Sequence, residues 1–165
     1  NDMSAPSISL EGKNIWLAQS LPITSWQAIR AKRSMHLLLT GIPAIICSIC
    51  AIIALKPTIL GAITIIAMPL VFILFFSMLG LVLNLKYPNL KWTNEITPIK
   101  QSMSVFVSMF GGWIYSIIIF AIYFPLSGRI SGELYLIGAA AFTGLLCLAL
   151  DSWLKKKGTK IFAEL

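Results

Sequence analysis

Charged residues are scarce in this chain. Aspartate, glutamate, lysine and arginine make up 12% of its 165 residues, whereas hydrophobic residues make up 58%. A soluble domain carries about 25% charged residues. So few charges cannot cover a water-facing surface without leaving large exposed apolar patches. The composition therefore excludes an ordinary soluble domain and predicts a protein that contacts the lipid bilayer.

The residue types and motifs that support catalysis are also missing. The sequence has one histidine, His36, and contains no HExxH motif and no intramembrane pair of aspartates. It has no G-x-x-x-x-G-K-[ST] loop, and the nearest fragment, KKKGTK at residues 155–160, lacks the first glycine. We therefore expect no enzymatic activity. Any ATP-driven work would need an ATPase on another polypeptide.

Cofactor and metal sites are not expected either. Cys47 and Cys50 match C-x-x-C, but they lie in an apolar run and no further ligands stand nearby to complete a tetrahedral zinc site. Packing is the favoured interpretation of these two residues and of Cys147. The net charge of +7 comes from basic residues that flank apolar runs and form no continuous stripe. Nucleic-acid binding is therefore not expected.

Four apolar runs are long enough to cross about 30 Å of hydrocarbon. They cover about 36–55, 59–85, 103–124 and 134–150, and none contains an acidic residue, a lysine or an arginine. Because lipid offers no partner for open backbone groups, these runs must be helices. The sequence thus predicts an all-α polytopic membrane protein with a transmembrane domain at 36–150. A short cytoplasmic or interfacial helical segment precedes it at 1–35, and a basic tail follows at 151–165.

The positions of lysine and arginine predict the orientation. Eleven of these residues lie before the first run, between the second and third runs, or after the fourth, and only two lie in the other loops. The positive-inside rule then places both termini in the cytoplasm. No basic region or A-x-A-like site marks the first residues as a secretory signal peptide.

Small residues recur at every fourth position of the third run, where they form a helix-packing stripe: Ser104, Ser108, Gly112 and Ser116. Their size allows another backbone to approach closely. Packing within the four-helix body is the favoured interpretation. A dimer seam and the lining of a translocation path are the alternatives.

Thr24 and Gln27 have the spacing of a capping box, which predicts a helix that begins at Thr24 and continues into the first span. Trp26, Arg30 and Arg33 share one face of this helix, and Lys32 adds a further charge. Such a face is suited to snorkelling at the membrane surface or to contact with an acidic partner.

Two polar blocks carry a resemblance to a known family. They are SLEGKNIWLAQSLPI at 9–23 and LNLKYPNLKWTNEITPIKQSMSV at 83–105, with AIRAKRSMHLLL at 28–39 between them. In this order they resemble the C-terminal half of bacterial ABC-2-type exporter permeases, which are common in Firmicutes. The match covers roughly 9–105. Members of that family are longer and have more spans, so the chain resembles part of a permease.

The resemblance implies a permease subunit in a bacterial plasma membrane that works with a separate cytoplasmic ABC ATPase and exports an undefined substrate. The remaining permease spans or a second copy of the chain would be further partners. Its motif positions fall in two groups: Glu11, Gly12, Lys13, Trp16, Leu21 and Pro22, then Pro88, Trp92, Thr93, Asn94, Glu95, Lys100 and Gln101.

We hypothesise that these blocks, together with Arg30, Lys32 and Arg33, form a cytoplasmic rim on which the ATPase acts. The alternative is that both blocks are only helix caps and interface anchors. For the whole chain, the alternative function is a small four-helix membrane scaffold, assembly factor or immunity-type protein without transport activity.

Overall fold

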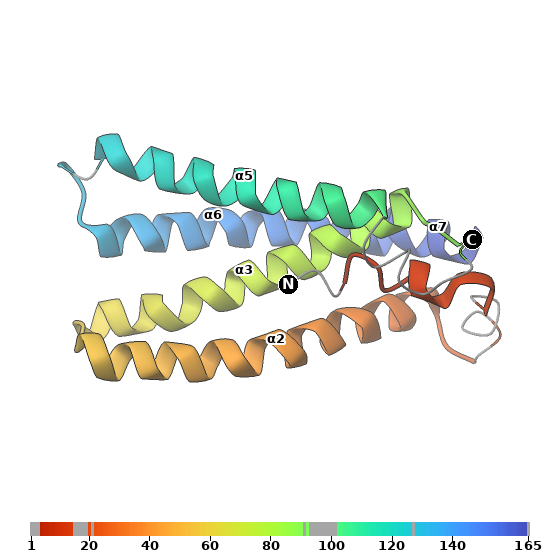
Figure 1. Cartoon of the computed structure of the whole chain (residues 1–165), viewed down its shortest axis with the longest axis horizontal. Coiled ribbons are helices and arrows are strands. Elements are labelled where there is room, and N and C mark those ends of the chain that lie inside the picture. Colours follow the sequence, from red (N-terminus) through yellow and green to blue (C-terminus); the bar gives the residue numbers. More distant parts are fainter. Residues whose placement is uncertain are drawn as a thin grey trace.

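A computed structural model of the chain describes residues 4–14, 20, 22–90, 92, 102–126 and 128–164. The described residues form helices and connecting turns and contain no strand. Figure 1 shows four long helices that lie roughly side by side. Shorter helical pieces gather at one end of this bundle.

The four long helices are α2 (Ser25–Leu55), α3 (Ile59–Lys86), α5 (Met103–Leu126) and α6 (Gly132–Trp153). A five-residue π-helix, η2 (Leu154–Gly158), and a last short helix, α7 (Thr159–Glu164), continue α6 without a break. Within the described residues, four helices are long and apolar enough to cross a membrane. The prediction of an all-α polytopic membrane protein is confirmed.

Local sequence signals set where these helices begin. Thr24 caps α2 with the predicted capping box: its hydroxyl accepts from the Gln27 N–H, and the Gln27 side chain accepts from the Thr24 N–H. α2 ends at Lys56, whose φ of 46° is left-handed, and Thr58 then caps α3. The turn at 56–58 therefore reverses the chain, which makes α2 and α3 antiparallel neighbours.

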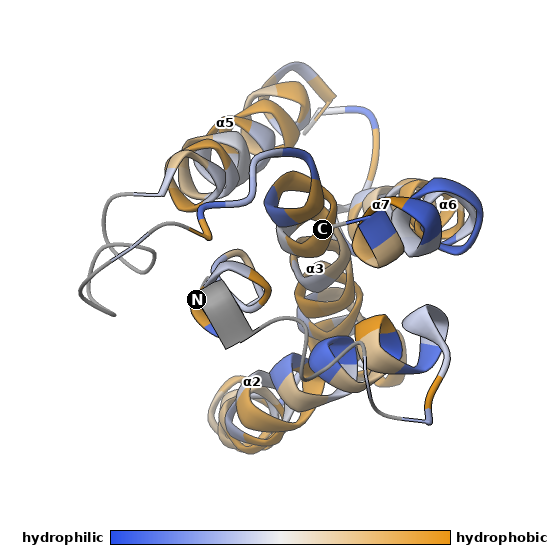
Figure 2. Ribbon diagram, turned by 90° about the vertical axis from the view of Figure 1, so that its right-hand side faces the viewer, coloured by the Kyte–Doolittle hydropathy of each residue, from blue (hydrophilic) through white to orange (hydrophobic). Residues whose placement is uncertain are grey.

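α3 is the central helix. In the end-on view of Figure 2 it lies in the middle, with α2, α5 and α6 around it, and each of these three helices packs against it. The outward faces remain apolar and exposed; Ile53, for example, is 69% exposed and Phe120 is 67% exposed. Such faces are suited to lipid, and the bundle buries its side chains mainly against α3.

The two ends of the bundle differ in what they carry. We call the end with residues 4–14, the chain after α3 and the C-terminal helices the basic end. The opposite end, with the turn at 56–58 and the connection between α5 and α6, is the hairpin end (Figure 1).

The most deeply buried apolar side chains gather at the basic end. Leu81 and Leu85 of α3 are at most 1% exposed and form a cluster with Ile8, Leu154 and Phe162. α3 has 28 residues, or about 42 Å, so it exceeds a hydrocarbon layer of about 30 Å. The part of α3 that exceeds this thickness packs against the N-terminal segment and the C-terminal helices. The residues at 151–165 that were predicted as a basic tail are helical through Glu164. Two of them, Leu154 and Phe162, are buried in the bundle.

Candidate functional site

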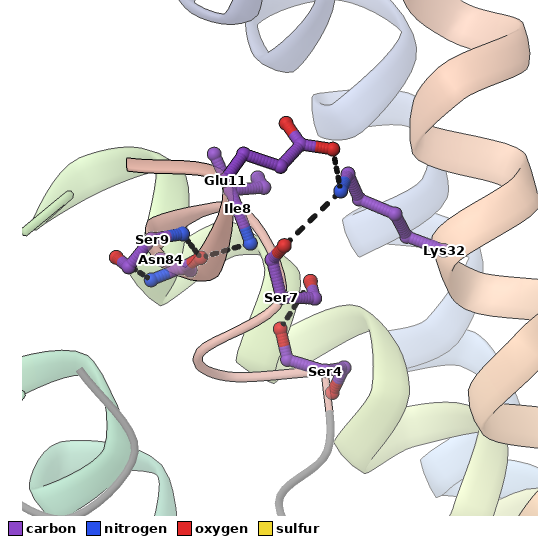
Figure 3. A network of polar contacts seen from close by, with 7 residues as sticks. All are labelled: Ser4, Ser7, Ile8, Ser9, Glu11, Lys32 and Asn84. Carbon is purple, nitrogen blue, oxygen red and sulfur yellow. Dashed lines mark hydrogen bonds and ion pairs between the residues drawn. The ribbon is translucent and has the colours of Figure 1, made fainter. Parts of the chain in front are cut away.

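One asparagine near the end of α3 connects the N-terminal segment to the bundle. Asn84 is fully buried, and its Oδ1 accepts from the N–H groups of Ile8 and Ser9, at 2.8 and 3.0 Å. Its Nδ2 donates to the hydroxyls of Ser9, at 2.7 Å, and Ser104, at 3.1 Å. An amide side chain offers two acceptor and two donor positions. All four are used here, so Asn84 fixes the segment against α3 and α5. Figure 3 shows the bonds of Asn84 to Ile8 and Ser9.

Ser9 brings the two resemblance blocks together. Its hydroxyl accepts from the Asn89 N–H at 2.9 Å, and its carbonyl accepts from Trp92 Nε1 at 2.6 Å. Gly12 lies beside the same indole and has a φ of 51°. A Cβ at Gly12 would stand 2.8 Å from the Trp92 ring, so both the backbone conformation and the close approach require glycine. Block residues about 80 positions apart therefore form one contact surface.

Lys32 of α2 holds the N-terminal segment from the opposite side. Its ammonium donates to the Ser7 carbonyl at 3.1 Å and pairs with the Glu11 carboxylate at 2.5 Å. Figure 3 shows the Lys32 side chain reaching from α2 to both groups. The Lys32 side chain is 16% exposed. Partial burial of the pair reduces solvent screening relative to a surface ion pair.

A second charged cluster joins α2 to the end of α6. Asp151 accepts from Arg33 through one carboxylate oxygen and from Lys155 through the other, each at 2.6 Å. The guanidinium of Arg33 and the ammonium of Lys155 also lie 5.7 and 5.3 Å from the centre of the Trp26 ring. These distances are typical of cation–π contacts. The cluster fixes the start of α2 against the C-terminal helices.

The structure brings together some of the predicted rim residues. Glu11, Gly12 and Trp92 meet around Ser9, and Lys32 joins them through Glu11. Arg33 belongs to the Asp151 cluster, Arg30 is exposed, and Pro88 is half-buried after α3. Lys13 lies in the 3-10 helix η1 (Ser9–Asn14), although its side chain is outside what the structure describes. The predictions for Trp16, Asn94, Glu95 and Lys100 lie outside the described residues.

The helix-packing stripe of α5 faces the bundle for most of its length. Ser104, Ser108 and Gly112 are buried, and a Cβ at Gly112 would stand 2.9 Å from the Phe76 ring of α3. Ser116 is exposed, and its hydroxyl donates to the Gly112 carbonyl at 2.9 Å. Three of the four small residues thus let α5 approach α3, whereas Ser116 lies where the two helices have separated.

Side chains that bind metals do not cluster in the described part of the chain. No group of three or more histidine, cysteine, aspartate and glutamate residues is found there. Cys47 and Cys50 are exposed on the outer face of α2, and Cys147 is buried. What the described residues assemble is a polar junction between an N-terminal segment, the central helix and the chain that follows it.

The sequence interpretation missed Asn84, although the sequence contained a signal. Asn84 lies in the run LVLNLK, at the end of the second predicted span. A polar side chain in an apolar span is costly in lipid unless it is paired, and so marks an internal contact. Ser9 carried no comparable signal, because serines are common in polar segments.

Fold and site together define a class: an all-α polytopic membrane protein whose N-terminal segment is inserted into one end of its helix bundle. In comparisons with known proteins, no protein-family model, curated protein or solved structure matched the chain.

Proposed function

We propose that this chain is a permease subunit, or part of one, of an ATP-binding-cassette exporter in a bacterial plasma membrane. A separate cytoplasmic ATPase would supply the energy. The observation that supports this best is the Ser9–Trp92 contact. The two blocks that resemble ABC-2-type permeases are far apart in sequence, yet they join at one end of the bundle. If the ATPase acts on this contact surface, both blocks would take part in coupling it to the permease.

In this proposal the junction passes a displacement to the central helix. A force on the chain after α3 would reach Ser9 through Trp92, and Ser9 is bonded directly to Asn84 of α3. Because α2, α5 and α6 all pack against α3, a movement of α3 would alter the whole bundle. In this proposal the basic end faces the cytoplasm and receives the ATPase.

Co-purification with an ATPase tests the partnership. The chain is co-expressed with an ATP-binding-cassette subunit encoded beside it, purified, and tested for permease-dependent ATPase activity in proteoliposomes. Arg30→Glu reverses an exposed charge at the basic end and should weaken the association at least severalfold. Lys32 and Arg33 are unsuitable for this test because they pair within the chain.

Trp92→Phe tests the coupling step. It removes the indole donor to Ser9 while it keeps an aromatic ring, so the complex should form but its stimulated ATPase rate should fall severalfold. Phe142→Leu, which alters an exposed aromatic residue of α6 away from the junction, is the control and should leave that rate unchanged. If no ATPase subunit is retained by the wild-type chain, the alternative of a membrane scaffold without transport replaces this proposal.

The orientation has its own test. Single cysteines at Lys56 and Lys157, in a chain whose own cysteines are replaced by alanine, are labelled with a membrane-impermeant reagent on intact cells. We expect labelling at 56 and protection at 157 until the cells are opened. The reverse pattern would place the basic end outside and would contradict the proposed ATPase contact.

A further inference from the structure

A cavity of about 420 Å³ lies between α2, α3 and α5. Ligand pockets commonly measure about 300–1,000 Å³, so this one falls in the lower part of that range. Every long helix except α6 contributes to its wall. The lining residues are His36, Phe72, Ile73, Phe76, Ser108, Met109, Gly112, Trp113 and Ser116.

The N-terminal segment packs on α3 next to this cavity, on the side of the basic end. The Ser4 hydroxyl lies 3.5 Å from the carbonyl of Phe76, whose ring lines the cavity. Ser4 and Ala5 also fill the space over Gly80, one turn of α3 further on; a Cβ there would stand 2.4 Å from Ser4 Oγ. Because Trp113 lines the cavity and is still 62% exposed, the cavity opens sideways between α2 and α5. In a membrane, that side faces lipid.

Polarity changes along the length of the cavity. His36 and Ser108 form its wall near the basic end, and both are buried. Two turns further along α5, or about 12 Å, the wall consists of Phe72, Trp113 and Ser116. The two aromatic rings make this end of the cavity largely apolar.

We propose that this cavity binds one molecule of a single-chain amphiphile, such as a lysophospholipid, from the leaflet at the basic end. Its headgroup would lie near His36 and Ser108, and its acyl chain would extend between Phe72 and Trp113. The polarity gradient requires a polar head and an apolar tail, and the lateral opening admits a molecule that is already in the bilayer. A slot of about 420 Å³ has room for one chain rather than for a diacyl lipid.

Adjacent glycines of α5 provide a matched pair of variants. Gly112 and Phe76 both line the cavity, and a Cβ at Gly112 would meet the Phe76 ring, so the larger side chain of Gly112→Leu would displace that ring into the cavity. A Cβ at Gly111 meets nothing within 4 Å, so Gly111→Leu makes the same chemical change on the same helix without entering the cavity. Ser116→Leu, at an exposed position of the wall, fills the apolar end and serves as a second variant if Gly112→Leu does not fold.

Quenching of Trp113 fluorescence measures the binding, because Trp113 lies in the wall. The purified full chain is placed in nanodiscs with a low mole fraction of phosphatidylcholine that carries bromine on its chain, either lyso or diacyl. Subtraction of the Trp113→Phe signal isolates Trp113. We expect saturable quenching by the lyso probe that is at least twofold stronger than that by the diacyl probe.

The Gly111→Leu chain should keep this difference, and Gly112→Leu and Ser116→Leu should lose it. Equal, non-saturating quenching by both probes would mean contact with bulk lipid only and would overturn the proposal. Retention of the saturable component in both cavity-filling variants would overturn it as well. The test uses no ATPase, so its outcome is independent of the proposed permease function.

Discussion

The two ends of this bundle are held in different ways. At the basic end, Asn84, Lys32 and Asp151 each connect segments that are distant in sequence. At the hairpin end, a hydrogen bond from the Thr58 hydroxyl to the Glu133 carboxylate joins the pair α2 and α3 to the pair α5 and α6. A cleft of about 440 Å³ also separates α5 from α6 over residues that include Phe120 and Tyr135.

This difference indicates where the bundle can change shape. Buried hydrogen bonds and ion pairs with little exposure resist local opening, whereas regions with few buried contacts open at low free-energy cost. α5 packs mainly against α3 and is bordered by a cavity on one side and by the cleft on the other. We therefore expect the basic end to move as one unit and the hairpin half of α5 to move more freely.

Asn84→Leu should disturb the basic end most. The change leaves the N–H groups of Ile8 and Ser9 buried without their acceptor, and each such group costs about 1–3 kcal/mol. The free energy of unfolding should fall by about 2–4 kcal/mol, measured by titration with a denaturing detergent. Hydrogen exchange at Ile8 and Ser9 should accelerate as well.

Asn84→Asp is the matched control for that change, because it keeps the acceptor oxygen and should retain most of the protection at both amides. If Asn84→Leu leaves exchange at Ile8 and Ser9 as slow as in the parent chain, Asn84 does not hold the segment.

Two glycines of α3 extend the comparison to backbone packing. In Gly80→Ala, the new Cβ would stand 3.0 Å from the backbone nitrogen of Ala5, which cannot turn away. In Gly61→Ala, at the hairpin end, the nearest atom is Glu133 Oε1 at 2.9 Å, the end of a flexible side chain. Overpacking costs about 1–3 kcal/mol. Gly80→Ala should therefore lower the unfolding midpoint and expose 4–14 to protease, and Gly61→Ala should do neither. Equal effects would remove the distinction between the ends.

Removal of one carboxylate from each end should give a smaller contrast. Asp151→Ala leaves Arg33, whose side chain is only 17% exposed, without its carboxylate partner. Hydrogen bonds to charged groups are worth about 1.5–3 kcal/mol, and the exposed half of the cluster at Lys155 adds little. We expect a loss of about 1–2 kcal/mol in detergent unfolding. Glu133→Ala, which removes an exposed hydrogen bond, should cost less; a larger loss there would contradict the comparison.

The helix caps should show the smallest effect. Thr24→Ala removes the capping box of α2, and loss of a threonine cap costs about 1 kcal/mol. Thr58→Ala removes the cap of α3 together with the bond to Glu133. Each threonine accepts a hydrogen bond from a backbone N–H in the first turn of its helix. The two variants should therefore destabilise the protein by similar amounts, measured as the shift in thermal unfolding midpoint. A shift several times larger for either one would mean that its end depends on the cap for more than helix initiation.

The sequence predicted what depends on local pattern. Four apolar runs without charge define the spans, and the Thr24–Gln27 spacing defines the start of α2, since both signals lie within a few residues of the structure they specify. Pairing across the fold was not predictable in this way. Nothing near Ser9 reveals that it meets Asn84, 75 residues later. Lys32 and Arg33 look like exposed interfacial cations in sequence, because a lysine that meets a headgroup and one that meets Glu11 have the same neighbours along the chain.

Because the amide of Asn84 has no hydrogen-bonding position left, the N-terminal segment can be seated in only one register. A slip by one residue would remove the Ile8 and Ser9 N–H groups from Oδ1 and would place a residue other than Gly12 against the Trp92 ring. Ser4 therefore meets α3 at a fixed height along that helix. Asn84 thus sets how deep residues 4–14 lie in the bundle before α2 begins.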